Sequence, residues 1–173
     1  MKTVVVYKST TGYTKKYADW ISSELNADIY EHSKIHSKKL CTYDTIIYGG
    51  SLHAVGIIGA KLITNNLNIL KNKKLIVFAT GASPFREKTI LEIKNKNFTQ
   101  EEQEYIHFYY FRGGFNYNKL NIFDKILMTL LRLKLKTKKN LTPDEKGMLA
   151  IYNKPVNYTR KSNIDDLISF VNS

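Results

Sequence analysis

The feature of this sequence that most constrains its fold is a series of short apolar runs, each followed by a polar or glycine-containing loop. The clearest runs are Val4–Tyr7, Thr45–Tyr48, Leu75–Ala79 and Ile106–Phe111, and a weaker one covers Ala27–Tyr30. They are rich in β-branched and aromatic residues, which is typical of β-strands. Segments long enough for helices separate them. We therefore predict an α/β fold, with a doubly wound, five-stranded parallel sheet and helices on both faces.

Apolar residues at helical spacing indicate where those helices lie. They recur up to Leu25 after the first strand, between Ile58 and Leu70, and around residues 88–94. Near the end of the chain, Ser162-Asn163 is placed to cap a helix whose apolar stripe ends at Val171.

The composition fits a single globular domain over residues 1–173, with 43% hydrophobic and 24% charged residues. Cys41 is the only cysteine, which excludes an internal disulfide and a cysteine-bound metal cluster. The first apolar run is too short for a signal peptide, and no apolar window reaches the roughly 18 residues that a membrane span needs. We therefore expect a cytoplasmic protein. Its net charge of +12 should attract anionic surfaces.

Three polar loops follow the first, third and fourth predicted strands: Ser9–Thr14, Gly49–Gly56 and Thr80–Pro84. The carboxyl ends of parallel strands meet at one edge of the sheet, where ligands bind in such folds. In the first loop, the hydroxyls of Ser9, Thr11 and Thr14 can donate to phosphate oxygens, while Gly12 allows close approach of the backbone. The helix that follows directs its free N–H groups at the anion. The sequence thus predicts a phosphate site, and it lacks the motifs for nucleoside triphosphates and dinucleotides.

These loops resemble those of the flavodoxin superfamily, in which the first binds the FMN phosphate and the other two flank the isoalloxazine ring. The resemblance implies that FMN is the cofactor and that the chemistry is carried by the flavin. The residue pattern itself predicts that the third strand ends at Gly49-Gly50. Leu52, His53 and Phe85 are candidates for contacts with the ring faces, and His53 is also a candidate catalytic residue. No metal ligands are predicted. The candidate cofactor-binding residues are Ser9, Thr10, Thr11, Gly12, Tyr13, Thr14, Gly50, Ser51, Leu52, His53, Ala54, Thr80, Gly81 and Ala82.

The segment 112–140 departs from a minimal flavodoxin and is predicted to be a basic helical insertion. Asn121 can cap a helix that carries apolar residues from Ile122 to Leu131. Such a helix could lie on an anionic bilayer, dock a hydrophobic partner, or cover one flank of the sheet. The basic residues between positions 119 and 139, opposed only by Asp124, are Lys119, Lys125, Arg132, Lys134, Lys136, Lys138 and Lys139.

Together with Gly81-Ala82-Ser83, this segment resembles the flavodoxin-like, menaquinone-dependent protoporphyrinogen oxidases. That resemblance implies that the insertion lies near the flavin and that the protein is an oxidoreductase, which passes electrons from a porphyrinogen through FMN to a membrane quinone. Arg86, Arg112 or Lys119 could then meet the propionates of the porphyrinogen or the headgroups beside the quinone. The alternative is a flavodoxin electron carrier without a substrate of its own, although typical carriers are acidic. Nucleic-acid binding is disfavoured because the basic residues lack interleaved exposed aromatics.

Overall fold

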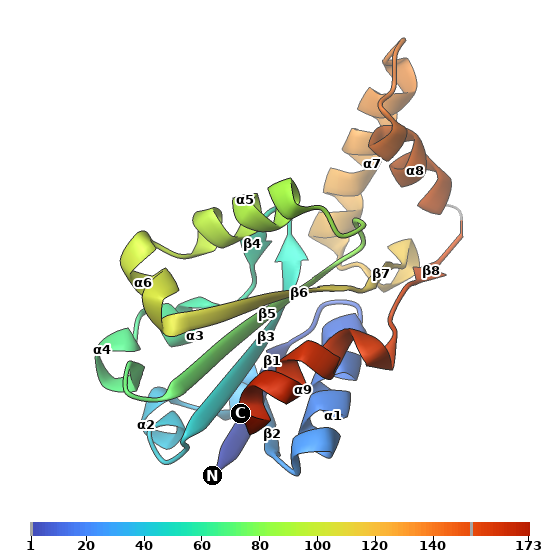
Figure 1. Ribbon diagram of the computed structural model, residues 1–173. Helices are drawn as coiled ribbons and strands as arrows, with labels where there is room; N and C mark the ends of the chain where they lie inside the picture. The colour runs from blue at the N-terminus through green and yellow to red at the C-terminus, as the bar shows by residue number, and fades with distance from the viewer. Residues whose placement is uncertain (1, 153) are drawn as a thin grey trace.

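The predicted parallel sheet is present in the computed structural model, which describes residues 2–152 and 154–173. Five parallel strands run in the order β2-β1-β3-β5-β6, as Figure 1 shows, which confirms the predicted fold class. Because each crossover returns the chain to the same end of the sheet, the loops after β1, β3 and β5 meet at one edge. The bounds of these strands are β1 Thr3–Lys8, β2 Asp28–Glu31, β3 Thr45–His53, β5 Lys74–Gly81 and β6 Ile106–Arg112.

Each face of the sheet buries its own apolar core, because successive side chains of a strand point to opposite faces. In β1, Val5 packs with α1 (Tyr13–Leu25) and α9 (Asp165–Asn172), whereas Val4 and Val6 belong to the core of the opposite face. That second core is covered by α5 (Glu87–Asn97) and by two one-turn helices, α3 (Lys61–Thr64) and α4 (Leu67–Leu70). The remaining short helices are α2 (Ser37–Leu40), α6 (Gln100–Tyr105) and the 3-10 turn η1 (His32–Lys34).

The sequence predicted that the third strand ends at Gly49-Gly50, and this prediction is wrong. The strand continues to His53 and folds back through a hairpin onto β4 (Gly56–Ile57). A side chain at Gly49 would overlap the ring of Phe78, and one at Gly50 would overlap Ile57. The two glycines therefore allow close packing inside the sheet and do not form a turn.

Two helix predictions also need correction. The segment from Ile58 to Leu70 forms α3 and α4 and no continuous helix. Before α9, the chain forms a 3-10 turn, η3 (Lys161–Ile164), so Ser162-Asn163 does not cap the helix. The Asn163 amide donates to the Tyr17 hydroxyl at 2.8 Å, which ties this turn to α1.

An arm projects from the body between β6 and η3 (Figure 1). It leaves through β7 (Gly114–Phe115), passes through η2 (Tyr117–Lys119), α7 (Ile122–Thr137) and α8 (Pro143–Ile151), and returns through β8 (Val156–Asn157). Since β7 and β8 pair antiparallel, the arm extends beyond the predicted segment 112–140. Asn121 caps α7 as predicted, accepting the Asp124 N–H at 2.8 Å.

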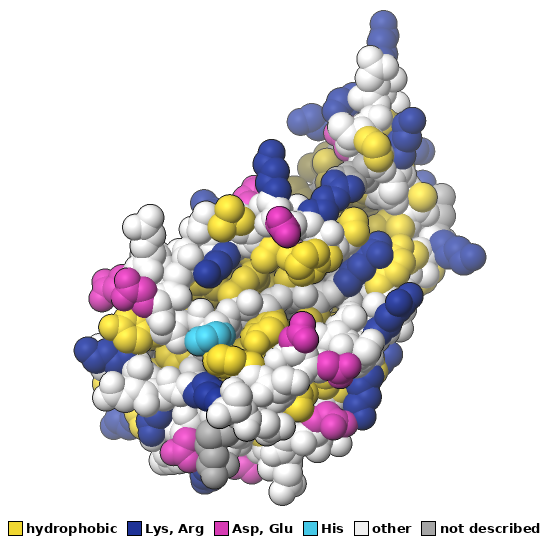
Figure 2. Space-filling view, in the orientation of Figure 1, with side chains coloured by type: hydrophobic (Ala, Val, Ile, Leu, Met, Phe, Trp, Pro, Cys, Tyr) yellow, Lys and Arg dark blue, Asp and Glu magenta, His cyan; other side chains and the backbone are white. Residues whose placement is uncertain are grey.

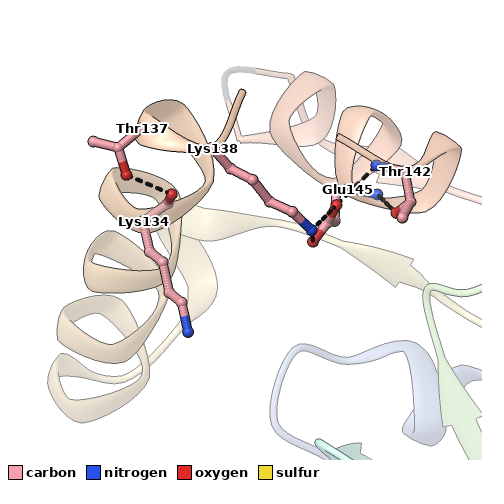
Figure 3. A network of polar contacts seen from close by, with 5 residues as sticks. All are labelled: Lys134, Thr137, Lys138, Thr142 and Glu145. Atoms are coloured by element: carbon pink, nitrogen blue, oxygen red, sulfur yellow. Dashed lines mark hydrogen bonds and ion pairs between the residues drawn. The ribbon is translucent and has the colours of Figure 1, made fainter. Parts of the chain in front are cut away.

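The turn between α7 and α8 is fixed by polar contacts (Figure 3). The Lys138 ammonium pairs with the Glu145 carboxylate at 2.8 Å, and the same carboxylate accepts the backbone N–H of Thr142. The Thr142 hydroxyl in turn accepts the Glu145 N–H, which completes a capping box at the start of α8. Across residues 2–152 and 154–173, no helix is both long and apolar enough to span a bilayer.

Candidate functional site

A cavity of about 530 Å³ lies at the edge of the sheet where β1, β3 and β5 end, a volume typical of small-molecule sites. The structure brings the three predicted loops together around it. The predicted site residues that line this cavity are Thr10, Thr11, Tyr13, Ser51, Leu52, His53, Ala54, Thr80, Gly81 and Ala82. Their contacts with a cofactor stay a prediction.

The first loop leaves the start of α1 open to an anion. Gly12 has a φ of 94°, a left-handed conformation that glycine adopts without strain. Its N–H donates to the Ser9 hydroxyl at 3.1 Å. Among the described residues no side chain caps α1, and its first turn holds no acidic residue. The N–H groups and the positive end of the helix dipole at Tyr13 are therefore not neutralised by the protein.

The buried hydroxyl of Thr14 joins the ends of two strands beneath this loop. It lies 2.7 Å from the Ser51 hydroxyl and 2.6 Å from the Thr80 hydroxyl. Ser51 also accepts the backbone N–H of Thr10 at 3.1 Å. Thr14 is fully buried and does not line the cavity, and the same holds for Gly50, which packs against Ile57. The three hydroxyls thus fix the loops relative to one another.

The opposite wall of the cavity comes from the arm. Its side chains are almost entirely apolar: Phe115, Leu120, Leu127, Met128, Leu131 and Met148. The resemblance implied that the insertion lies near the flavin, but it did not give these residues. In the sequence itself, α7 carries apolar residues around most of its circumference, which indicates burial on more than one face.

One polar contact links the arm to the hairpin after β3. The His53 Nε2 atom lies 3.0 Å from the Asp124 Oδ1 atom, and both residues line the cavity. The second carboxylate oxygen of Asp124 accepts the Asn121 side-chain amide at 2.8 Å. Because a carboxylate partner fixes the orientation of an imidazole, this pair can hold a proton at the cavity wall.

The tyrosines at the site remain protonated at neutral pH. Burial raises the pKa of Tyr110 to about 12, and its hydroxyl donates to the Ser83 carbonyl at 2.7 Å. Burial also raises the pKa of Tyr13, whose hydroxyl donates to the Val156 carbonyl at 3.0 Å. Tyr13 therefore joins the first loop to the base of the arm.

The basic residues that the sequence placed near the site do not line the cavity. Arg112 donates to the Ala82 carbonyl at 3.2 Å and stacks on Tyr158, 3.6 Å from the ring centre. Within the described part of the chain, no lysine or arginine lines the cavity, so Arg86 and Lys119 lie outside its wall. Phe85 is 68% exposed and lines a second cavity beside Arg112, so it is not part of this wall.

The strand order β2-β1-β3-β5-β6, with a ligand-sized cavity at the ends of β1, β3 and β5, is that of the flavodoxin-like class of doubly wound α/β proteins. A family model for the flavodoxin domain matches residues 4–142, and the chain therefore belongs to this family.

An uncharacterised protein of Methanocaldococcus jannaschii is 36% identical over 87 residues, which cover 49% of this chain and 57% of that protein. This chain thus matches little more than half the length of that relative.

Several solved structures are similar in fold. The Trp repressor binding protein from Bacillus subtilis has a TM-score of 0.49 at 16% identity, covering 65% of this chain and 83% of its own. Flavodoxin 1 from Bacillus cereus has a TM-score of 0.45 at 19% identity, with coverage of 65% and 84%. A flavoprotein from Lactobacillus acidophilus, solved in complex with FMN, has a TM-score of 0.44 at 19% identity, with coverage of 64% and 91%.

Proposed function

We propose that this protein binds FMN non-covalently and acts as an oxidoreductase whose second ligand is an apolar, quinone-class molecule. The observation that carries the proposal is the composition of the cavity wall. One side consists of three polar loops at the strand ends, and the other consists of apolar side chains from α7 and α8. The polar side suits a phosphorylated cofactor with an aromatic ring system, and the apolar side suits a hydrophobic second ligand.

The residues present fit an FMN. Ser9, Thr11 and Gly12 would hold the phosphate with the uncapped start of α1, which needs no lysine or arginine. Gly81 would let the backbone approach the ring closely, since a side chain there would meet the Tyr110 hydroxyl and Leu52. Membership of the flavodoxin family and the FMN complex of the Lactobacillus acidophilus flavoprotein support this assignment.

The chain itself orients the ligands, shields them from water and manages protons. When bound, FMN supplies the redox chemistry, because its ring takes up and releases electrons that side chains do not carry. Leu127, Met128 and Leu131 would shield one side of the bound ligands from water. Reduction of a quinone to a quinol consumes protons as well as electrons, and His53, held by Asp124 at 3.0 Å, is placed to move a proton at the wall.

The absence of cations from the described cavity wall favours a quinone over a porphyrinogen. The propionates of a porphyrinogen would need lysine or arginine partners, whereas no lysine or arginine lies along the described lining and Asp124 is the one carboxylate residue there. A flavodoxin electron carrier is the alternative. The apolar side chains along one wall of the cavity favour an oxidoreductase, because a carrier that only docks on proteins has no use for a hydrophobic ligand site of this kind.

Anaerobic reoxidation of the photoreduced, FMN-loaded protein tests this proposal. A water-soluble naphthoquinone should restore the visible flavin absorbance with saturation kinetics. Leu127→Gln should raise the half-saturating quinone concentration several-fold, since a half-exposed apolar side chain on the cavity wall is replaced by a polar one. Leu133→Gln is the matched control, because Leu133 lies on the same helix with similar exposure (56% against 53%) but does not line the cavity.

Two outcomes would decide against the quinone assignment. Reoxidation that depends linearly on quinone concentration and is equal in both variants would favour the carrier. Bleaching of the oxidised flavin by protoporphyrinogen, with the same sensitivity to Leu127→Gln, would place a porphyrinogen in the cavity.

A further inference from the structure

The outer surface of α7 carries an apolar stripe that no described residue covers. It consists of Ile122, Phe123, Ile126, Leu130 and Leu133, each between 55% and 85% exposed. Successive helical residues are turned by about 100°, so these five side chains share one side of the helix. The cavity-lining residues Met128 and Leu131 lie on the other side. Large exposed apolar surfaces of this kind mark interaction sites.

Lysines border this outer stripe on both sides. By the same helical geometry, Lys125 and Lys136 lie along one margin and Lys134 lies along the other. Among the described residues, none of the three forms an ion pair with a carboxylate. Figure 3 shows the Lys134 ammonium pointing away from the Lys138–Glu145 pair. A shallow depression of about 290 Å³ lies along one margin of the stripe, where Ile122, Ile126 and Leu130 face Tyr117, Lys125 and Thr129.

The whole arm is strongly basic. Residues 114–157 contain nine Lys and Arg against three Asp and Glu, so about a quarter of the chain carries half of the net charge of +12. Figure 2 shows several Lys and Arg side chains on the visible face of the projecting arm. A second copy of the chain on this face would place two such arms against each other, and their repulsion would oppose the contact.

We propose that the outer stripe of α7 docks on an anionic lipid bilayer, with the helix lying in the plane of the headgroups. The apolar side chains would enter the boundary with the acyl chains, while the lysine stems extend along them and place their ammonium groups among the phosphates. Charge complementarity favours this occupant, because the stripe combines lysine margins with an apolar centre along the length of the helix. The proposal does not depend on FMN binding.

Cosedimentation with vesicles tests it on the full chain. The protein should bind vesicles of phosphatidylglycerol and phosphatidylcholine at low ionic strength, and should bind pure phosphatidylcholine much more weakly. Phe123→Ser/Leu130→Ser should weaken binding at least about tenfold, because two large side chains no longer enter the bilayer. Ile69→Ser/Leu91→Ser is the matched control, since these residues are 48% and 57% exposed on α4 and α5. This control variant should bind anionic vesicles with an affinity within about twofold of that of the wild type.

A second pair of variants separates the electrostatic contribution to vesicle binding from the apolar contribution. Lys134→Gln/Lys136→Gln should weaken binding to anionic vesicles by about tenfold at low salt, and this difference should shrink at high salt. The control Lys88→Gln/Lys96→Gln removes the same charge from the exposed surface of α5 and should change binding much less.

Three results would overturn the proposal: no binding of the wild type to anionic vesicles, equal binding of the stripe variant and its control, or a concentration-dependent dimer that only the stripe variant abolishes. An FMN titration of each variant keeps the two proposals separate. Loss of vesicle binding with unchanged FMN affinity supports membrane docking regardless of what the flavin site does.

Discussion

Thr14 shows how a single buried hydroxyl supports the geometry of the cavity. Its hydroxyl contacts both Ser51 and Thr80 within 2.7 Å. Thr14→Val keeps the shape of the side chain but removes both contacts, so it should lower the free energy of unfolding by about 1–3 kcal/mol in urea denaturation. Thr42→Val is the control, because the Thr42 hydroxyl donates to the Lys39 carbonyl at an exposed position. This substitution should lower the free energy of unfolding by less. Equal losses in the two variants would contradict this account of Thr14.

The motif around Thr14 also shows the limit of sequence reasoning at this scale. The pattern of hydroxyls and Gly12 predicted the position of the loop, and the structure places it at the edge of the cavity. The pattern does not distinguish a hydroxyl that faces a ligand from one that faces the sheet. That distinction depends on how α1 sits over β3 and β5, which is decided by packing distant in the sequence.

Tyr110 leads to a prediction about alkaline stability. Burial raises its pKa to about 12, whereas a tyrosine in the unfolded chain ionises near its ordinary pKa of 10.0. Between these values the folded state binds more protons, so the stability that Tyr110 contributes is present below pH 10 and lost as the pH rises through about 12. Burial also raises the pKa of Tyr48.

The free energy of unfolding should therefore fall steadily above pH 10, and in Tyr110→Phe it should fall more gently. Urea denaturation at a series of alkaline pH values measures this, with tyrosinate absorbance recorded in parallel. Identical pH dependence in the wild type and Tyr110→Phe would show that this hydroxyl is not held neutral by the fold.

At the scale of elements, the regular strands and helices could be predicted and the irregular ones could not. Paired glycines usually indicate a turn, but Gly49 and Gly50 lie inside β3 because Phe78 and Ile57 occupy the space of their side chains. The helix α8 has a local sequence pattern that is typical of a helix start. Thr142 and Glu145 form a capping box, and Pro143 occupies the first turn. The two-residue strands β7 and β8 carry no such signal, because their pairing is purely tertiary.

The attachment of the arm gives a prediction about one element. Tyr13 donates a hydrogen bond to the Val156 carbonyl in β8, and its ring packs against Gly114 in β7. Tyr13→Phe removes only the hydrogen bond, which contributes about 1 kcal/mol. Hydrogen exchange should therefore speed up several-fold in residues 114–157 while the amides of the central strands stay protected.

Tyr105→Phe is the control for that experiment, since no hydrogen bond of the Tyr105 hydroxyl is present among the described residues. It should leave the exchange of the arm unchanged. Uniform acceleration throughout the sheet in Tyr13→Phe would show that the arm does not open as a separate unit.

At the scale of the whole molecule, the sequence predicted the fold because few topologies connect alternating strands and helices with right-handed crossovers. It also predicted that three loops meet at one edge. It did not predict which residues of the arm form the far wall of the cavity, since the contact between His53 and Asp124 joins residues 71 positions apart. Nor does the net charge of +12 reveal by itself that half of it lies in the arm.

The central claim is that the three-loop cavity binds FMN through its phosphate and its ring. Titration of FMN fluorescence with the cofactor-free protein tests this most directly, with riboflavin as the matched ligand that lacks the phosphate. The account predicts saturable quenching at one FMN per chain and binding of riboflavin weaker by at least about tenfold, because it forgoes the contacts at the start of α1. Absence of FMN binding, or equal affinity for FMN and riboflavin, would contradict it.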